Sequence, residues 1–201
     1  MRLGHLLTLL PLCIVACMPL TTADKESESL SETNNIGTNR IALQSINGDF
    51  DGDGESECAT LYHIPEEVIM ADSTTVAEVI EESYIIAFDD TQIPPKVSTN
   101  RLSHLTHLGD INNDGKDEYG VYSDGESSWG HFSAYCNREA EWQNIASTTL
   151  NIKLLERIGE VVDFENLITA DAEEPGNAII RHITILDGEK ITSTKESVQL
   201  I

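Results

Sequence analysis

The sequence of 201 residues has few basic residues, few aromatic residues and only 4 cysteines. Its 12 Lys and Arg stand against 35 Asp and Glu, which gives a formal net charge of −23. This balance argues against nucleic-acid binding, because phosphate recognition needs clustered Lys and Arg. With 40% hydrophobic but only 5% aromatic residues, the composition is that of a globular chain with a small core and a solvated surface. We expect one folded domain.

The apolar run at the N-terminus is short. Residues 6–16 form an 11-residue stretch broken only by Thr8 and Pro11. Such a run cannot span a bilayer, and it fits the core of a signal peptide over residues 1–16. The run leads into the sequence IVAC at residues 14–17, which resembles the lipobox of bacterial lipoproteins. The resemblance implies cleavage after residue 16 and lipidation of the Cys17 thiol. An ordinary secretory signal that is cleaved elsewhere is the alternative.

Acyl chains on Cys17 would anchor the protein to a membrane without a spanning helix. The next residue is Met18 and not Asp, which by analogy with the Gram-negative sorting rule implies the outer membrane. We therefore expect a lipid-anchored protein of the cell envelope, and the side of the membrane that it faces is left open. Residues 17–38 are rich in Ser, Thr, Glu and Asn and lack apolar periodicity, which predicts a flexible acidic tether. The β-rich domain is then expected at residues 39–201.

Two cysteines, Cys58 and Cys136, lie in the expected domain. An even pair in an oxidising compartment can form a disulfide. Two separate buried thiols are the alternative, because the sequence does not show whether the two Cα atoms lie within bonding distance. Both interpretations stay open at this point.

Part of the chain is repeated at an offset of 61 residues. Residues 39–57 have the sequence NRIALQSINGDFDGDGESE, and residues 100–118 have the sequence NRLSHLTHLGDINNDGKDE. Seven of the 19 aligned positions are identical, including the opening Asn-Arg, which two unrelated acidic loops would not share. We therefore predict two repeats, at residues 39–99 and 100–150, and a C-terminal segment at residues 151–201.

Each repeat contains a nine-residue acidic loop: loop 1 at residues 49–57 and loop 2 at residues 110–118. Oxygen-bearing side chains stand at every second position, and a Gly follows the third of them. Because this Gly allows a tight turn, the alternate side chains can aim at one centre. Oxygen ligands without Cys or His favour calcium over zinc or copper. An EF-hand is excluded, because it needs a Glu at position 12, where these loops have Thr60 and Val121.

The pattern D-x-[DN]-x-D-G-x-x-[DE] between two strands resembles the calcium loops of integrin-alpha, FG-GAP and VCBS repeats. The resemblance implies that the side chains at positions 1, 3, 5 and 9 and the carbonyl at position 7 bind the ion. In loop 1 these are Asp49, Asp51, Asp53, Glu57 and the carbonyl of Glu55. In loop 2 they are Asp110, Asn112, Asp114, Glu118 and the carbonyl of Lys116. The family usually has Asp at position 9, so the two Glu residues are conservative departures.

Asx-rich turns that bind no ion are the alternative interpretation of both loops. Two such loops in register favour the ion, because several carboxylates within a few ångströms repel one another unless a cation neutralises them. We therefore predict up to two Ca²⁺ ions. Asp117 is expected to lie outside the set of direct ligands.

Segments outside the loops predict a mainly β fold. Strands are expected after each loop and at residues 84–88 and 129–135, where alternation of apolar residues predicts a half-buried strand with aromatic side chains in the core. Residues 65–83 fit either a helix or a hairpin. Residues 152–168 have the apolar spacing of an amphipathic helix, and residues 179–200 are expected to form a closing hairpin.

A closed β-propeller needs at least about four blades, and the domain is too short for them. We expect two antiparallel, blade-like sheets, an incomplete propeller-like arrangement with a short C-terminal helix and hairpin. The arrangement resembles short VCBS-repeat lipoproteins of Bacteroidetes-type bacteria. Open sheets leave exposed edge strands, which could associate with another chain.

The sequence lacks a G-x-S-x-G elbow, a P-loop and an H-E-x-x-H motif. His104, His107 and His131 are a weaker metal candidate, because the first two would point to opposite faces of a strand. The leading hypothesis is a calcium-stabilised, membrane-anchored lipoprotein that acts as a non-catalytic binding or structural module for a protein or glycan. The alternative is a hydrolase, or a hydrolase accessory subunit, for an extracellular polymer. The acidic pairs at residues 81–82 and 89–90 could suggest glycosidase chemistry, but adjacent residues on a strand diverge, so a charged face is the favoured interpretation.

Overall fold

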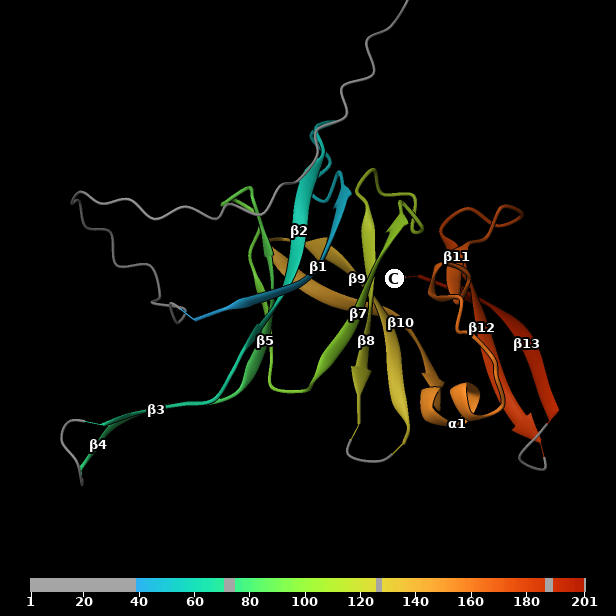
Figure 1. Ribbon diagram of the computed structural model, residues 1–201. Coiled ribbons are helices and arrows are strands. Elements are labelled where there is room, and N and C mark those ends of the chain that lie inside the picture. Colours follow the sequence, from blue (N-terminus) through green and yellow to red (C-terminus); the bar gives the residue numbers. More distant parts are fainter. Residues whose placement is uncertain (1–38, 71–74, 126–127, 187–189, 201) are drawn as a thin grey trace, which may run out of the picture. The chain divides into compact units, whose positions relative to one another are not determined.

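The computed structural model describes residues 39–70, 75–125, 128–186 and 190–200. These residues form open antiparallel sheets, so the prediction of a mainly β fold with blade-like sheets is confirmed (Figure 1). Two sheets have four strands each, one has three, and a fourth is a two-stranded hairpin. The predicted signal peptide and the whole predicted tether, residues 17–38, lie outside the described residues.

Sheet 1 has the strand order β1-β2-β5-β6. Its strands are β1 (Ile41–Gly48), β2 (Glu57–Ile64), β5 (Ser83–Phe88) and β6 (Lys96–Ser98). Between β2 and β5 the chain forms the separate hairpin of β3 (Glu67–Met70) and β4 (Val76–Ile80). The segment that fitted either a helix or a hairpin is therefore a hairpin, and the expected strand at residues 84–88 is present.

Sheet 2 is an antiparallel meander with the order β7-β8-β9-β10. Its strands are β7 (Leu102–Gly109), β8 (Glu118–Asp124), β9 (Gly130–Arg138) and β10 (Glu141–Leu150). Sheet 3 has the order β11-β12-β13, with strands β11 (Ile168–Ala170), β12 (Asn177–Leu186) and β13 (Lys190–Gln199). The long β12-β13 pair confirms the expected closing hairpin, and its predicted turn at residues 187–188 lies outside the described residues.

The predicted helix over residues 152–168 is too long. Helix α1 covers only Ile152–Arg157, with Asn151 accepting a hydrogen bond from the amide of Leu154 at its N-terminus. Gly159, at φ +81°, ends the helix, and the amide of Glu160 returns to the carbonyl of Leu155 in the pattern of a Schellman motif. A short 3₁₀ turn, Phe164–Asn166, then leads into β11. The apolar residues after Gly159 thus lie in irregular chain, a 3₁₀ turn and β11, and not on one face of a helix.

Sheet 2 lies between two hydrophobic cores. Core A joins sheets 1 and 2; its buried residues are Phe50, Ala59, Leu61, Tyr84, Ile86, Ile93, Leu102, Leu105, Tyr119 and Val121. Core B joins sheets 2 and 3; its buried residues are Ile111, Tyr122, Phe132, Ala134, Ala146, Leu150, Leu167, Ile168, Ala178, Ile180 and Leu200. On β8, alternate side chains therefore enter different cores.

This double coverage corrects the prediction of a half-buried strand at residues 129–135. In β9 Phe132 and Ala134 lie fully buried in core B, as the alternation predicts. Ser133, on the opposite face, is also buried, and Tyr135 packs against core A. The polar face is covered because sheet 1 packs on it, which no local pattern in β9 encodes. The core location expected for the aromatic residues is confirmed for Phe132, whereas Trp129 is 47% exposed.

The two cysteines of the domain, Cys58 on β2 and Cys136 on β9, are separate buried thiols and not a disulfide. The open question from the sequence is thereby answered. Burial raises the pKa of the Cys136 thiol above its ordinary value, so it is held in its neutral form.

Candidate metal centre

Loop 1 and loop 2 occupy equivalent places in the two four-stranded sheets. Loop 1 connects β1 to β2, and loop 2 connects β7 to β8. In each hairpin the last residue of the first strand is a Gly that pairs with the Glu at position 9, as Gly48 with Glu57 and Gly109 with Glu118. The Gly at position 6 has φ +89° in both loops, so the turn uses the backbone freedom of glycine.

The acids of loop 1 converge. One ligand oxygen from each of Asp49, Asp51, Asp53 and Glu57 can be chosen so that all lie within 4.8 Å of one another. Main-chain amides fix all four of these side chains. Asp49 accepts from Gly52 and Gly54 at 2.8 and 2.9 Å, and Glu57 Oε2 accepts from Phe50 at 2.8 Å. Asp51 and Asp53 each accept from the amide two residues on.

Glu57 brings a buried carboxyl group to the centre of loop 1. The residue is only 7% exposed, and the hydrogen bond from Phe50 engages Oε2. Oε1 accepts no hydrogen bond from the described part of the chain, and it is thus available to a ligand. Burial raises the pKa of Glu57 above its ordinary value, the Phe50 amide opposes this, and the charges of Asp51, Asp49 and Asp53 add to the rise. A cation among these oxygens would relieve both the desolvation and the repulsion.

Loop 2 has the same backbone pattern but a different centre. Asp110 accepts from the amides of Asp114 and Gly115, and Glu118 Oε2 accepts from Ile111. The amide group of Asn112, however, donates from Nδ2 to Asp114 Oδ2 at 3.0 Å and to Glu118 Oε1 at 2.9 Å. Its Oδ1 accepts from the Asp114 main chain at 2.8 Å, which fixes the orientation of the amide. In loop 2 the Asn112 side chain therefore bridges the carboxyl groups of Asp114 and Glu118. In loop 1 the carboxyl groups face one another directly.

Glu118 is fully buried, and this burial is the main cause that raises its pKa to about 8. The hydrogen bond from Ile111 lowers the pKa, and the charge of Asp114 raises it. Without an ion, the carboxyl group is therefore held mostly neutral at pH 7.

Asp117 joins the two loops. Its main-chain amide donates to the carbonyl of Asp49 at 2.7 Å, and its Oδ2 accepts from the amide of Asp49 at 2.9 Å. The same Oδ2 lies 2.8 Å from Nε2 of His107. Both side chains pack closely against Gly48, because a Cβ atom there would stand 2.8 Å from the His107 ring and 3.0 Å from Asp117 Oδ2. Asp117 thus bonds to the main chain of a predicted ligand residue, an arrangement that nothing in the local sequence of either loop signals.

Two of the predicted ligands are main-chain carbonyl groups, those of Glu55 and Lys116. The side chain of Glu55 is exposed, and Nζ of Lys116 lies 3.4 Å from the carbonyl of Asn137. The proposed roles of the Glu55 and Lys116 carbonyls stay predictions.

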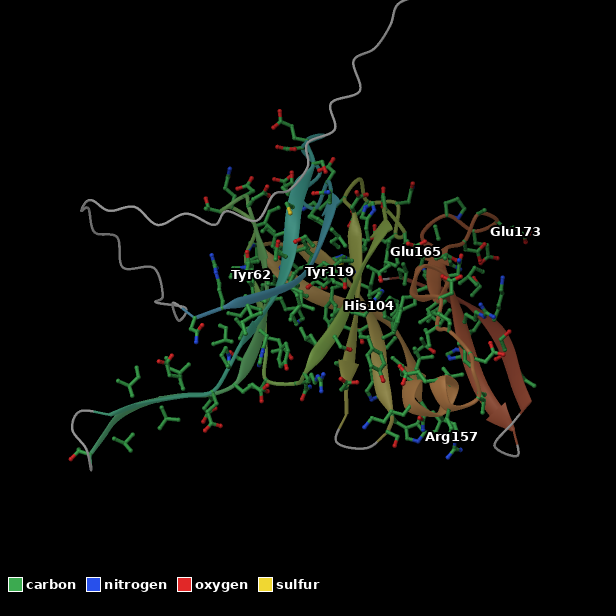
Figure 2. All side chains as sticks on the ribbon, viewed as in Figure 1. Tyr62, His104, Tyr119, Arg157, Glu165 and Glu173 are labelled. Carbon is green, nitrogen blue, oxygen red and sulfur yellow. The ribbon has the colours of Figure 1, made fainter. Side chains whose placement is uncertain are left out.

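The alternative histidine site is not assembled. His104 is labelled in Figure 2. Its ring stacks on Phe164 at 4.0 Å between ring centroids, on the side of core B. His107 pairs with Asp117 on the side of loop 1, and His131 lies beside Thr149. The two histidines of β7 thus point to opposite faces, as the strand geometry predicts.

Three of the four acids in the pairs outside the loops have local structural partners. Glu82 accepts from Tyr84 and lies 2.9 Å from His63, while Asp89 accepts from the main-chain amide of Cys58 and Asp90 from that of Gln92. Two cavities bounded by described residues have no Asp or Glu in their linings. The hydrolase alternative remains a prediction.

Among the described residues, no helix combines the length and the apolar character needed to cross a membrane. The sequence matches no protein-family model, and neither the curated proteins nor the solved structures contain a significant match to it.

Proposed function

We propose that this protein is a calcium-stabilised, lipid-anchored module of the cell envelope that binds a protein or glycan partner without catalysing a reaction. The observation that carries the calcium part is the convergence of four carboxyl groups in loop 1, one of them the buried Glu57. Oxygen atoms from Asp and Glu in a glycine-turned loop are the ligands that Ca²⁺ prefers.

Ion binding at loop 1 would stabilise more than the loop itself. Asp49 and Glu57 stand at the two ends of the loop that connects β1 to β2. Asp49 also bonds through its main chain to Asp117 of loop 2. A cation that fixes Asp49 would therefore fix the contact between loop 1 and loop 2. The proposed role of calcium is to hold the loop ends of sheets 1 and 2 in one geometry.

Melting of the purified protein in calcium and in chelator tests this proposal. An ion that binds only the folded state raises stability by about 2.7 kcal/mol at a concentration 100 times its dissociation constant. For a domain of this size we expect a rise in Tm of about 5–10 °C. Magnesium at equal concentration is the control, because it prefers a smaller octahedral shell and should give a smaller rise. Equal Tm values in calcium and chelator would contradict the proposal.

The anchoring part is supported by the sequence around Cys17 alone. Lipid labelling of cells that express the native protein or the Cys17→Ser variant tests it separately. We expect label and membrane association only with the native cysteine. A variant that is labelled and membrane-bound like the native protein would contradict the anchor and leave the calcium proposal standing.

A further inference from the structure

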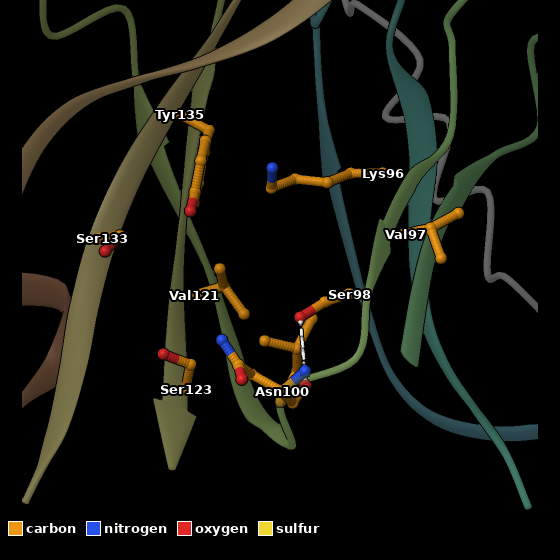
Figure 3. Close-up of a pocket in the computed structure, with 9 residues that line it drawn as sticks. Lys96, Val97, Ser98, Asn100, Val121, Ser123, Ser133 and Tyr135 are labelled. Carbon is orange, nitrogen blue, oxygen red and sulfur yellow. Dashed lines mark hydrogen bonds between the residues drawn. The ribbon is translucent and has the colours of Figure 1, made fainter. Parts of the chain in front are cut away.

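A cavity of about 230 Å³ lies between sheets 1 and 2 (Figure 3). Its walls come from the short edge strand β6, from the segment that follows it, and from β7, β8 and β9. The lining residues are Lys96, Val97, Ser98, Asn100, Leu102, Val121, Ser123, Ser133 and Tyr135. Val97 and Asn100 are exposed, whereas Leu102 and Val121 are buried, so the cavity has a solvent-accessible rim and an apolar floor.

The charge of this cavity is opposite to that of the chain. Lys96 is the one charged side chain among the described residues that line it, although acids outnumber bases by 35 to 12 in the sequence. Figure 3 shows that the Lys96 side chain extends toward Tyr135. Its Nζ stands over the Tyr135 ring, 4.2 Å from the centroid. Within the described part of the chain, no carboxylate lies within ion-pair distance of this ammonium group. The ring holds the ammonium at the cavity wall, and the donors that face away from the ring can bind an anion.

Neutral hydrogen-bonding groups complete the lining. Ser98 and Asn100 bond to each other through the Ser98 hydroxyl and the Asn100 main chain, and Ser133 bonds to Ser147. The side-chain amide of Asn100 and the hydroxyl of Ser123 make no hydrogen bond to another described residue. Hydroxyl and amide groups of this kind can both donate to and accept from the hydroxyl groups of a ligand.

The volume restricts the ligand to one small ring. Sites for drug-sized ligands occupy roughly 300–1,000 Å³, and this cavity is smaller. The cavity offers a single cation, a few hydroxyl and amide groups and an apolar floor. These groups match a small ring that carries one carboxylate and several hydroxyl groups. We propose that the cavity binds the hexuronate unit of an acidic sugar, with the carboxylate on Lys96 and the hydroxyl groups on Asn100 and Ser123. None of the lining residues is a predicted calcium ligand, so the inference does not rest on ion binding.

Calorimetric titration of the purified full chain with D-glucuronate tests the inference. D-glucose is the neutral match that lacks the carboxylate, and acetate is the carboxylate that lacks the ring and its hydroxyl groups. A short galacturonate oligomer tests whether a unit at a chain end binds as a free sugar acid does, and binding of glucuronate is the result that the proposal requires. We expect glucuronate to bind at least about tenfold more tightly than glucose or acetate, because each lacks one set of charge-assisted or neutral hydrogen bonds.

Variants of the cationic residue make the test specific. Lys96→Met keeps the apolar stem and should weaken glucuronate binding at least about tenfold, whereas Lys96→Arg should restore most of it. Lys153→Met is the matched control, because Lys153 is an exposed lysine on α1 outside the cavity. Binding by Lys96→Met equal to that of the native chain would overturn the proposal. So would absence of glucuronate binding, or equal affinities for glucuronate and glucose or for glucuronate and acetate.

Titrations in calcium and in chelator separate this inference from the proposed role of the loops. Loss of the calcium-dependent rise in Tm would count against the ion site alone. Failure of glucuronate to bind a protein that calcium does stabilise would count against the cavity alone.

Discussion

Loop 1 and loop 2 share their length, their glycine turn and their place between the first two strands of a sheet. They differ in which group faces the carboxyl groups, and this difference comes from position 3. At position 3 loop 1 has Asp51 and loop 2 has Asn112. Asn112 donates to two carboxylates of its own loop, and Asp51 adds a fourth carboxyl group to the cluster of loop 1. The amide in loop 2 supplies positive hydrogen atoms at the position where, in our proposal, a cation neutralises loop 1.

The sheets that carry the two loops also differ, in how much of each sheet is covered by other elements. Sheet 1 contributes to core A only, whereas sheet 2 contributes to cores A and B. Correspondingly, Glu57 in loop 1 is 7% exposed and Glu118 in loop 2 is fully buried. Of the two predicted calcium sites, the geometry therefore favours loop 1 as the one that depends on an ion. Loop 2 has the contacts of a structural support to which loop 1 is joined by Asp117.

Converting loop 2 into the chemistry of loop 1 should have the largest effect. In chelator, Asn112→Asp would remove two hydrogen bonds and add a carboxylate beside the buried Glu118, at a cost of about 3 kcal/mol. We expect a fall in Tm of about 6–12 °C by differential scanning calorimetry, and recovery in calcium. Asn113→Asp adds the same charge at an exposed neighbouring position and is the control. Equal stability of the two variants in chelator would show that the amide bridge does not distinguish the loops.

The contact between the loops gives the second prediction. Asp117→Ala leaves the main-chain amide of Asp49 without its acceptor and removes the partner of His107, which should cost about 2 kcal/mol in urea unfolding. A double-mutant cycle with His107→Ala should give a coupling energy of about 0.5–1 kcal/mol, because the pair is partly exposed. Additive effects would argue that Asp117 and His107 act independently.

The third prediction converts loop 1 toward loop 2. Asp51→Asn removes one charged ligand and should weaken calcium binding about tenfold, which is about 1.4 kcal/mol of calcium-dependent stabilisation. The stability in chelator should not fall, since a like-charge repulsion is removed with the carboxylate. Glu55→Gln removes the same charge from a side chain outside the carboxyl cluster and keeps the main-chain carbonyl, so it is the matched control. A calcium response that both variants retain in full would place Asp51 outside the ligand set.

The sequence was sufficient to predict the features that depend on local pattern. Gly54 and Gly115 mark both turns, and the strands expected after the two loops are present as β2 and β8. Gly159, which ends α1, is also a local signal. The apolar spacing beyond it continued to fit a helix, so the helix was predicted too long. Its later apolar residues, such as Phe164, pack against core B from a turn.

The features that the sequence did not reveal depend on contacts between distant segments. Asn112 was predicted as an oxygen ligand, because composition does not show that its amide group faces two carboxylates. The role of Asp117 depends on loop 1 packing against loop 2, and the cavity at Lys96 requires β6 to lie opposite β9. Coverage of both faces of sheet 2 likewise follows from the positions of sheets 1 and 3 and not from the alternation within β9.

The smallest predicted effect concerns pH and the double coverage of sheet 2. His104 stacks on Phe164, and burial lowers the pKa of His104 below its ordinary value of 6.5, with only Glu165 opposing the shift. The unfolded chain then binds more protons than the folded chain as the pH falls through 6.5, so this residue destabilises the fold at lower pH. Because the ring is partly exposed, we expect a loss below about 1 kcal/mol between pH 7 and pH 5. His104→Phe keeps an aromatic ring against Phe164 without a titrating group, and its urea unfolding should show a correspondingly shallower decline over this range. A decline as steep as that of the native protein would mean that the core B face of β7 is more open to water than its packing indicates.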